Sequence, residues 1–291
     1  MRVRLDQVLV ERGLCESREK AKRAVMAGAV RVNGQLAHKP SDVVRESDAV
    51  ELSGGEKFAS RGGHKLEHAL EHFQIEVTGA TALDLGASTG GFTDCLLQRS
   101  AAKVFAVDVG HGQLAWKLRH DPRVVVMEKT NARTLTLAQV EAVALRPHSA
   151  ERGAPEPQQP RKVGRAAALE SRAPSQTDSP RSARLSTLTV DLIVIDCSFI
   201  SLRKILPAAI ALVKPLGKIV ALIKPQFEAG KAEADRGEGV ITDPAVHARV
   251  LRELEEFVGG MSGADWRGVT ESPLLGPAGN KEFLVLIEKR G

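Results

Sequence analysis

Four charged residues that lie far apart in the sequence have the side chains needed to activate a hydroxyl group, namely Lys65, Asp196, Lys224 and Glu282. Asp196 and Lys224 each end an apolar run, and Glu282 begins the last apolar run of the chain. Burying an unpaired charge is costly, so each of these residues requires a partner. Two ammonium groups beside two carboxylates suit the orientation and deprotonation of a hydroxyl. Because Lys65 alone would be a solvated residue on a helix, the prediction depends on a fold that gathers all four.

A glycine-rich segment, DLGASTGGFT at residues 84–93, ends the first strand of the predicted sheet. Such a turn lets the backbone approach a ligand closely, although a plain strand–helix connection is the alternative. Dinucleotide-binding enzymes require the spacing G-x-G-x-x-G, whereas the glycines here are Gly86, Gly90 and Gly91. The looser spacing after Asp84 favours S-adenosylmethionine, which carries no pyrophosphate.

Two polar residues after the next strands complete the predicted cofactor site. Asp108 is placed to accept hydrogen bonds from a ribose diol, and Asn131 is placed to flank the adenine. The residues predicted to bind the cofactor are Asp84, Gly86, Ala87, Ser88, Thr89, Gly90, Gly91, Phe92, Thr93, Asp108, Val109, Asn131, Ala132, Asp196 and Phe199.

The strands that must position these residues are near-continuous runs of Val, Ile and Leu, which indicate a mostly parallel sheet covered by helices on both faces. We predict a helix at 62–73 and then strands at 81–87, 103–110, 124–129, 191–198, 218–224, 265–272 and 282–289. This is a doubly wound, Rossmann-like α/β domain with a seven-stranded sheet whose last strand is antiparallel. Ligands bind at the carboxyl ends of the parallel strands in such sheets, and the four charged residues would meet at that edge.

Residues 1–53 predict a small α+β unit. A first helix ends near Gly13, and Ser17 is a plausible N-cap for a second helix at 18–27 that stops at Gly28. Asn33-Gly34 is the strongest short hairpin signal, and a further strand follows at 49–52. We therefore expect a linker at 54–60 and a second domain at 61–291.

One segment, residues 147–186, interrupts the alternation of strands and helices. It contains six prolines and six arginines, without an aromatic residue or an apolar period. Because it cannot bury enough surface to offset its ordering entropy, we predict a disordered insertion. A basic arm that orders on RNA is the alternative.

The composition narrows the class of protein. The 291-residue chain has a formal net charge of +5, which favours a polyanionic partner without proving one. Cys15, Cys95 and Cys197 are too few and too widely spaced for a disulfide scaffold or a Cys-rich zinc module. The N-terminal segment lacks a secretory apolar region, and no stretch is apolar enough to span a membrane. We therefore expect a cytoplasmic, monomeric protein without a metal or a membrane partner.

The N-terminal unit carries a cluster of basic residues. Arg18 and Lys22 are four apart on the second predicted helix and share a face, which could bind phosphates or could simply be solvated. The residues predicted to contact RNA are Arg4, Arg18, Lys20, Lys22, Arg23 and Lys39, with Arg4 and Arg18 foremost. The chain has no tyrosine and few other aromatic residues, which argues against a base-stacking platform.

A resemblance to a known family adds to these predictions. The segments SRGGHKLEHAL, DLGASTGGFTDCLL, VDVGHGQLAWKLR, TNARTL, DLIVIDCSFISL, IKPQFEAGK and GNKEFLVLIEK resemble the TlyA family, whose members are ribosomal RNA 2′-O-ribose methyltransferases, also named hemolysins. Its catalytic domain resembles the FtsJ type, and residues 1–53 are similar to an S4 RNA-binding domain. The motifs span nearly the whole chain except for 147–186, where family members have a short connection.

The resemblance implies roles for individual residues. Lys65, Asp196, Lys224 and Glu282 match a Lys-Asp-Lys-Glu tetrad, in which Lys224 takes or polarises the 2′-hydroxyl proton and the others orient it and the ribose. Phe199 helps to position the cofactor or the target nucleoside, or is ordinary packing. The implied cofactor is S-adenosylmethionine, and the implied substrate is a cytidine in 16S or 23S ribosomal RNA, free or in subunits.

Three other functions stay open at this point. A non-catalytic RNA-binding or ribosome-assembly factor would not need the four charged residues. A hemolysin would need a segment that inserts into membranes. An NAD-dependent oxidoreductase is disfavoured by the glycine spacing.

Overall fold

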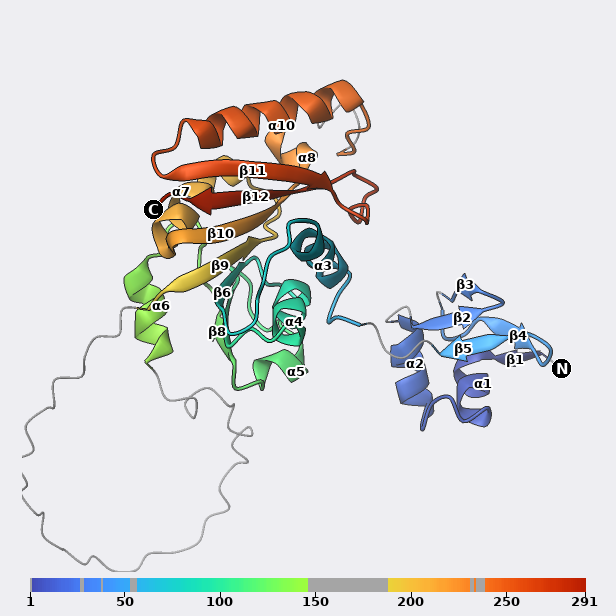
Figure 1. Cartoon of the computed structure of the whole chain (residues 1–291). Coiled ribbons are helices and arrows are strands. Elements are labelled where there is room, and N and C mark those ends of the chain that lie inside the picture. Colours follow the sequence, from blue (N-terminus) through green and yellow to red (C-terminus); the bar gives the residue numbers. More distant parts are fainter. Residues whose placement is uncertain are drawn as a thin grey trace, which may run out of the picture.

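The computed structural model of the chain describes residues 2–26, 29–37, 39–52, 57–145, 188–230, 233 and 239–291 (Figure 1). The predicted insertion at 147–186 and residues 54–56 of the predicted linker lie outside these residues. The domain boundaries at 53 and 61 stay predictions.

A seven-stranded sheet forms the larger part of the described chain. Its strands lie in the order β11-β12-β10-β9-β6-β7-β8. The bounds are β6 Thr81–Leu85, β7 Lys103–Val107, β8 Val124–Met127, β9 Val190–Ile195, β10 Val213–Ile223, β11 Ala264–Glu271 and β12 Phe283–Lys289. The pairs β6–β7, β7–β8, β6–β9 and β9–β10 are parallel, whereas β12 pairs antiparallel with both β10 and β11. The predicted fold class, with its reversed last strand, is confirmed.

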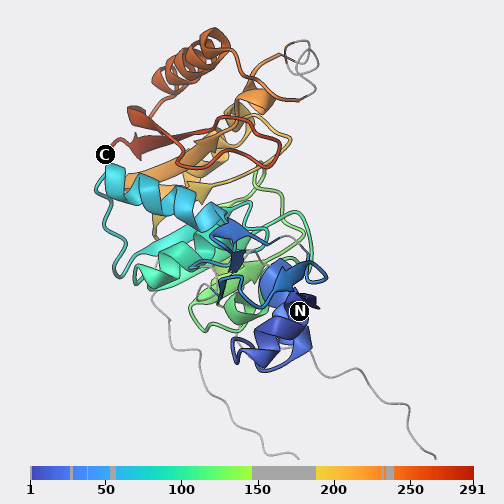
Figure 2. The same ribbon diagram turned by 90° about the vertical axis from the view of Figure 1, so that its right-hand side faces the viewer.

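Helices cover both faces of this sheet, which is why the strands are apolar on both sides. Alternate residues of β9 belong to two different hydrophobic cores, one on each face of the sheet. Leu192 belongs to the first core and Ile193 to the second. The first core packs against α3 (Gly62–His72), α4 (Gly91–Gln98) and α5 (Trp116–Arg119). The second packs against α6 (Leu137–Ala144), α7 (Leu206–Leu212) and α10 (Pro244–Gly259). Figure 2 looks onto the side that carries α3.

Two short helices follow the strands that carry the site. The 3-10 helix η1 (Leu202–Lys204) comes after β9, and α8 (Pro225–Glu228) comes after β10. Pro225 stands at the first position of α8, where the missing N–H costs nothing. Both helices start close to the carboxyl edge of the sheet and thereby fix the loops there.

The N-terminal unit has its own small core around Leu5, Leu9 and Val25. Its elements are β1 (Arg2–Arg4), α1 (Leu5–Glu11), α2 (Arg18–Met26), β2 (Val30–Val32), β3 (Gln35–Leu36), β4 (Val43–Arg45) and β5 (Val50–Leu52). Ser17 Oγ accepts a hydrogen bond from the Lys20 N–H, which confirms the predicted cap of α2. Asn33 and Gly34 both have positive φ, as the predicted hairpin requires.

Several predicted element bounds were wrong at their ends. The first strand ends at Leu85, not at residue 87, because Gly86 (φ +89°) already belongs to the turn. Strand β10 begins at Val213, five residues before the predicted start, and pairs irregularly with β9 there. The short strands β1 and β4, which pair with each other, were not predicted.

Candidate active site

Strand register brings three of the four charged residues to one edge of the sheet. Ile195 pairs with Leu85 of β6 and with Ala221 of β10, so Asp196 follows at the end of β9. Ile223 pairs with Phe283 across the antiparallel β10–β12 ladder. Lys224 follows Ile223 in β10, and Glu282 precedes Phe283 in β12. Because the two strands are antiparallel, Lys224 and Glu282 lie across from each other at the same edge of the sheet.

The four charged residues form two ion pairs. Lys224 Nζ lies 2.6 Å from Asp196 Oδ1 and donates a hydrogen bond of 2.8 Å to Ser198 Oγ. Lys65, on α3, pairs with Glu282, and their side chains are only 8% and 1% exposed. Because loss of one partner would leave a buried charge unpaired, each pair fixes the positions of both its members.

All four residues line one cavity of about 560 Å³ at the carboxyl edge of the sheet. The same cavity is lined by Gly86, Ala87, Ser88, Thr89, Gly91 and Phe92 of the glycine turn. Its far wall comes from Leu275 and Pro277, in the loop between β11 and β12. The predicted convergence of the tetrad residues is therefore present in the geometry, beside the glycine turn.

The glycine turn approaches the end of β9 closely. A Cβ atom on Gly86 would lie 2.6 Å from the carbonyl oxygen of Asp196, and the residue has φ +89°. The Asp196 N–H donates to Leu85 O at 3.0 Å, which locks the two strand ends together. Glycine is required at this position because any side chain would collide with the backbone that carries Asp196.

Asp84 lies fully buried beneath the turn. Its Oδ2 accepts a 2.6 Å hydrogen bond from Thr93 Oγ1, whereas its Oδ1 has no hydrogen-bond partner among the described residues. Burial, reinforced by the negative charge of Asp196, raises the pKa of Asp84 to about 7. A buried carboxyl oxygen without a partner, under a turn that lines a cavity, fits a site for a ligand that carries positive charge.

A second cavity of about 450 Å³ adjoins the first and shares Gly86, Ser88, Asp196 and Ser198 with it. It is lined by further residues of the predicted cofactor site, which are Asp108, Val109, Asn131, Ala132 and Phe199. The Asp108 carboxylate accepts hydrogen bonds from Ser88 N (2.8 Å) and Gly110 N (2.6 Å). Each of its oxygens retains a lone pair for a further donor such as a ribose hydroxyl.

Three residues predicted to bind the cofactor do not line either cavity. Asp84 and Thr93 are buried under the turn and bond to each other. Gly90 has φ +94°, and a Cβ there would collide with Leu114 and Leu118, so this glycine is required for packing against the segment at α5. The prediction placed these three residues in the correct turn. It did not distinguish residues that line a cavity from residues that hold the turn in place.

Phe199 stands out in the loop after β9. Its side chain is 90% exposed at the rim of the second cavity, and its φ of +63° lies in the left-handed region, which is costly for a bulky residue. The Phe227 ring lies 5.2 Å away, centroid to centroid. An exposed aromatic ring held in a strained conformation is available to a ligand and contributes little to the core.

Two further residues support the tetrad but were not predicted. Ser198 accepts the hydrogen bond from Lys224. Glu228, at the end of α8, accepts from Ser201 Oγ at 2.6 Å and from Leu202 N at 2.7 Å, and so ties the loop after β9 to the segment after β10. Burial raises the pKa of Glu228. The sequence signal that could have identified them is their position: Ser198 comes two residues after Asp196, and Glu228 comes four residues after Lys224.

The predicted RNA-contact residues lie on the N-terminal unit. Arg4 and Arg18 both pair at 3.0 Å with the fully buried Asp6, and the hydrogen bond from Arg4 is the main cause that lowers the pKa of Asp6 to about 2. The two guanidinium groups are thereby fixed side by side, each about half exposed. This arrangement presents paired donors to solvent.

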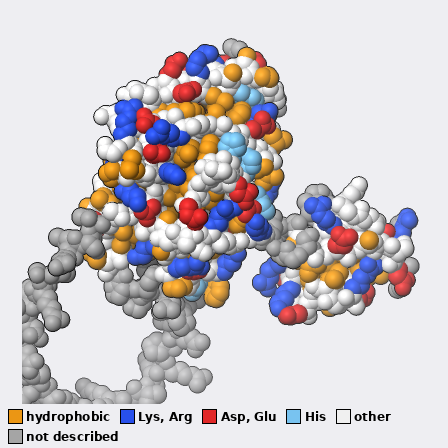
Figure 3. All heavy atoms as spheres, viewed as in Figure 1, with side chains coloured by type: hydrophobic (Ala, Val, Ile, Leu, Met, Phe, Trp, Pro, Cys, Tyr) orange, Lys and Arg blue, Asp and Glu red, His pale blue; other side chains and the backbone are white. Residues whose placement is uncertain are grey.

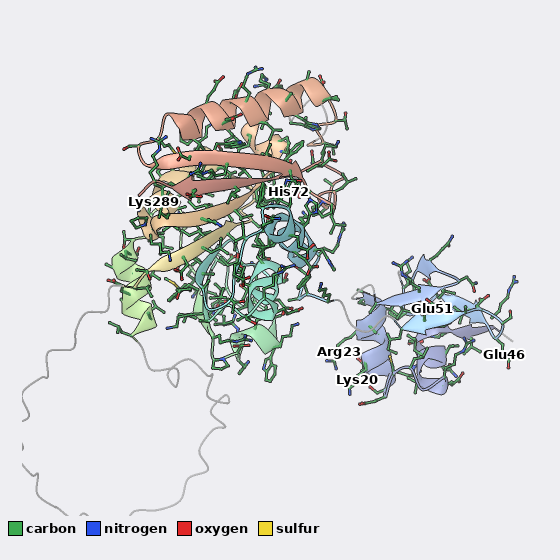
Figure 4. All side chains as sticks on the ribbon, viewed as in Figure 1. Lys20, Arg23, Glu46, Glu51, His72 and Lys289 are labelled. Carbon is green, nitrogen blue, oxygen red and sulfur yellow. The ribbon has the colours of Figure 1, made fainter. Side chains whose placement is uncertain are left out.

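The other predicted RNA contacts are less organised. Lys20 pairs with Glu16, which precedes α2, and Lys22 pairs with Glu19 on α2. Arg23 and Lys39 are exposed. Lys20 and Arg23 project outward from α2 (Figure 4). Basic and acidic side chains are intermixed over the visible face of this unit (Figure 3), so its positive charge is local.

Two negative findings apply to the part of the chain that the structure describes. Within it, no group of three or more His, Cys, Asp or Glu side chains is placed to hold a metal ion. None of its helices combines the length and apolar character needed to cross a lipid bilayer.

The sheet order, the glycine turn and the cavity together define the chain as a methyltransferase. Residues 58–289 match the FtsJ-like methyltransferase family, and residues 3–50 match the S4 domain. The chain is 41% identical to the 16S/23S rRNA (cytidine-2′-O)-methyltransferase TlyA of Mycobacterium tuberculosis, over 98% of this chain and 89% of that protein.

Two more relatives agree with this assignment. Hemolysin A of Brachyspira hyodysenteriae is 34% identical over 97% of this chain and 98% of that protein. A solved structure from Streptococcus thermophilus, provisionally named a hemolysin, has a TM-score of 0.65 and 36% identity and covers 99% of this chain and 89% of that one. The chain belongs to the TlyA family of FtsJ-like methyltransferases with an S4 domain, and the resemblance seen in its motifs is confirmed.

Proposed function

We propose that the chain transfers a methyl group from S-adenosylmethionine to the 2′-hydroxyl of a ribose in ribosomal RNA, with a cytidine as the target. The observation that carries the proposal is the joint lining of one cavity by the glycine turn and by Lys65, Asp196, Lys224 and Glu282. The similarity to the M. tuberculosis protein, which is named as a cytidine-2′-O-methyltransferase, supports the choice of substrate. The cytoplasmic location and the monomeric state stay predictions.

The cofactor site we propose consists of the two adjoining cavities. The glycine turn, with Asp84 buried beneath it, lines the first cavity. Asp108 and Asn131 line the second, where a ribose and an adenine would fit. When bound, S-adenosylmethionine supplies a methyl group that is already activated on a sulfonium. The chain's own contribution is therefore mainly alignment.

Within this proposal the four charged residues act on the acceptor ribose. Lys224, fixed by Asp196 and Ser198, would take or polarise the 2′-hydroxyl proton. The hydroxyl oxygen would then bond to the methyl carbon as the bond from that carbon to the sulfonium sulfur breaks, which leaves a neutral thioether. Proton removal by a positioned group contributes about 10² to 10⁴-fold in rate. The buried Lys65–Glu282 pair, which lines the same cavity, orients the ribose. The exposed Phe199 ring positions the target nucleoside or the cofactor.

The test uses purified protein, radiolabelled S-adenosylmethionine and ribosomal subunits, with mapping of 2′-O-methyl sites in the RNA. Lys224→Ala should abolish transfer and leave S-adenosylmethionine binding within a few-fold. Lys214→Ala is the matched control, because Lys214 pairs with Asp191 on the same two strands at the opposite edge of the sheet. Turnover retained by Lys224→Ala would contradict its assigned role. RNA binding by the wild type without any methyl transfer would favour the assembly-factor alternative.

A further inference from the structure

An exposed tryptophan lies close to the site but lines neither cavity. Trp116, the first residue of α5, is 75% exposed, whereas the other tryptophan of the chain, Trp266 in β11, packs against the sheet core. The Trp116 ring lies 4.2 Å from the His120 ring, centroid to centroid, at an angle of 31° between the planes. His120 Nδ1 is also 2.8 Å from the carbonyl oxygen of Trp116. The two rings lie against each other and face solvent.

Packing holds this surface against the glycine turn. Leu114 and Leu118, on either side of Trp116, occupy the space that a Cβ atom on Gly90 would need. The N–H of Ala115 donates to the carbonyl oxygen of Thr89 at 3.2 Å. Gln113, three residues before Trp116, lines the second cavity. Trp116 is therefore fixed next to the edge at which methyl transfer is proposed.

The charged side chains around α5 form ion pairs. The acidic residues there are engaged, because Glu128 pairs with Arg119 and Asp121 pairs with Arg123. Lys117 bridges to Asp94 and remains 56% exposed.

Two further cations, which follow β8, give this side of the molecule an excess of positive charge. Lys129 and Arg133, after β8, are exposed and have no ion-pair partner in the described ranges. Arg133 also lines the second cavity. Exposed cations beside an exposed aromatic pair complement a strand that carries both phosphates and bases.

We propose that Trp116 and His120 form a stacking platform for an unpaired base of the RNA that flanks the target nucleotide. The inference rests on the proposed RNA methylation and adds a second contact to it, outside the cofactor site. Stacking on aromatic rings tolerates any base because every base has a π-face. The low aromatic content of the chain argues against such a platform. A single stacking contact, however, needs only one exposed ring, and Trp116 is exposed.

The first experiment detects stacking without catalysis. Trp266→Phe leaves Trp116 as the single tryptophan, and this protein is titrated with single-stranded oligocytidine RNA while tryptophan emission is recorded. We expect quenching by the RNA and none by heparin, a polyanion without bases. The matched Trp116→Phe protein should show no quenching. Equal effects of RNA and heparin, or no quenching at RNA concentrations that saturate binding of a labelled oligonucleotide, would overturn the inference.

The second experiment measures the contribution to substrate binding. Trp116→Ala should raise KM for ribosomal RNA about 5- to 150-fold, as expected for the loss of one base–aromatic stack. It should change kcat at saturating RNA less than two-fold and leave S-adenosylmethionine affinity unaltered, and Trp116→Phe should restore most of the loss. An unchanged KM in an active enzyme would refute the platform. If the wild type methylates no RNA, the proposed function fails, and the quenching experiment still decides on the platform.

Discussion

The buried Asp84 should make the stability of the chain depend on pH in a direction opposite to that of a typical acid. Its pKa is raised from 3.8 to about 7 by burial and by nearby negative charge. Between about pH 4 and pH 7 the unfolded chain has released this proton whereas the folded chain retains it. The contribution of Asp84 to the free energy of unfolding therefore falls as pH rises, and it stays constant above the folded pKa.

The magnitude follows from the shift. Each pKa unit corresponds to about 1.36 kcal/mol, so a shift of about three units costs roughly 4 kcal/mol at pH 8 relative to pH 4. Asp84→Asn removes this cost and keeps an oxygen that can accept the Thr93 hydrogen bond. The unpaired amide N–H of the new asparagine changes the stability of the variant by the same amount at every pH. The prediction therefore concerns how the difference in the free energy of unfolding between variant and wild type changes with pH.

The assay is urea unfolding of both proteins from pH 5 to pH 8, followed by tryptophan fluorescence, since both tryptophans lie in the larger unit. The free energy of unfolding of Asp84→Asn minus that of the wild type should increase by about 1.4 kcal/mol per pH unit and level off near pH 7. Asp121→Asn is the control, because Arg123 lowers the pKa of Asp121 and its loss should destabilise at neutral pH. A difference for Asp84→Asn that is independent of pH would refute the reasoning.

Two further predictions concern the glycine turn and the N-terminal unit. Gly79→Ala (φ +73°, open space) should lower the free energy of unfolding by the ~1–2 kcal/mol of left-handed strain alone. Gly86→Ala should lower it by clearly more, because the new Cβ at position 86 would lie 2.6 Å from a backbone oxygen. Equal losses for the two variants in urea denaturation would contradict this. Asp6, with its pKa lowered to about 2, stabilises the folded unit above about pH 4, and this contribution should disappear as pH falls towards 2. Amide hydrogen exchange in α1 would measure the loss, and Asp6→Asn should already show it at neutral pH.

Much of the site was predictable because it depends on strand ends. The apolar runs gave the strands, and the parallel order placed Asp196 and Lys224 at the same edge. The reversal of the last strand then placed Glu282 there as well. Lys65 was the least certain of the four from its own surroundings, since nothing local distinguishes it from a solvated lysine. Its pairing with Glu282, 217 residues away, is purely a tertiary contact.

Other features could not be predicted because they depend on side-chain surroundings. The strands β1 and β4 have three residues each, too few for a periodic signal, and they form only by pairing with each other. The roles of Ser198 and Glu228 follow from hydrogen bonds between two loops that the sequence does not align. The exposure of Trp116 arises because its flanking leucines, and not its own ring, pack against the turn.

The antiparallel placement of β12 has a consequence for how the protein is made. Glu282 comes almost at the end of the chain, whereas its partner Lys65 comes early and lies in the interior. A ribosome that synthesises this protein releases Lys65 long before the carboxylate that neutralises it. Burial of that ammonium is unfavourable until the final strand inserts beside β10. The four charged residues can therefore assemble only after β12 has been synthesised and has paired with β10.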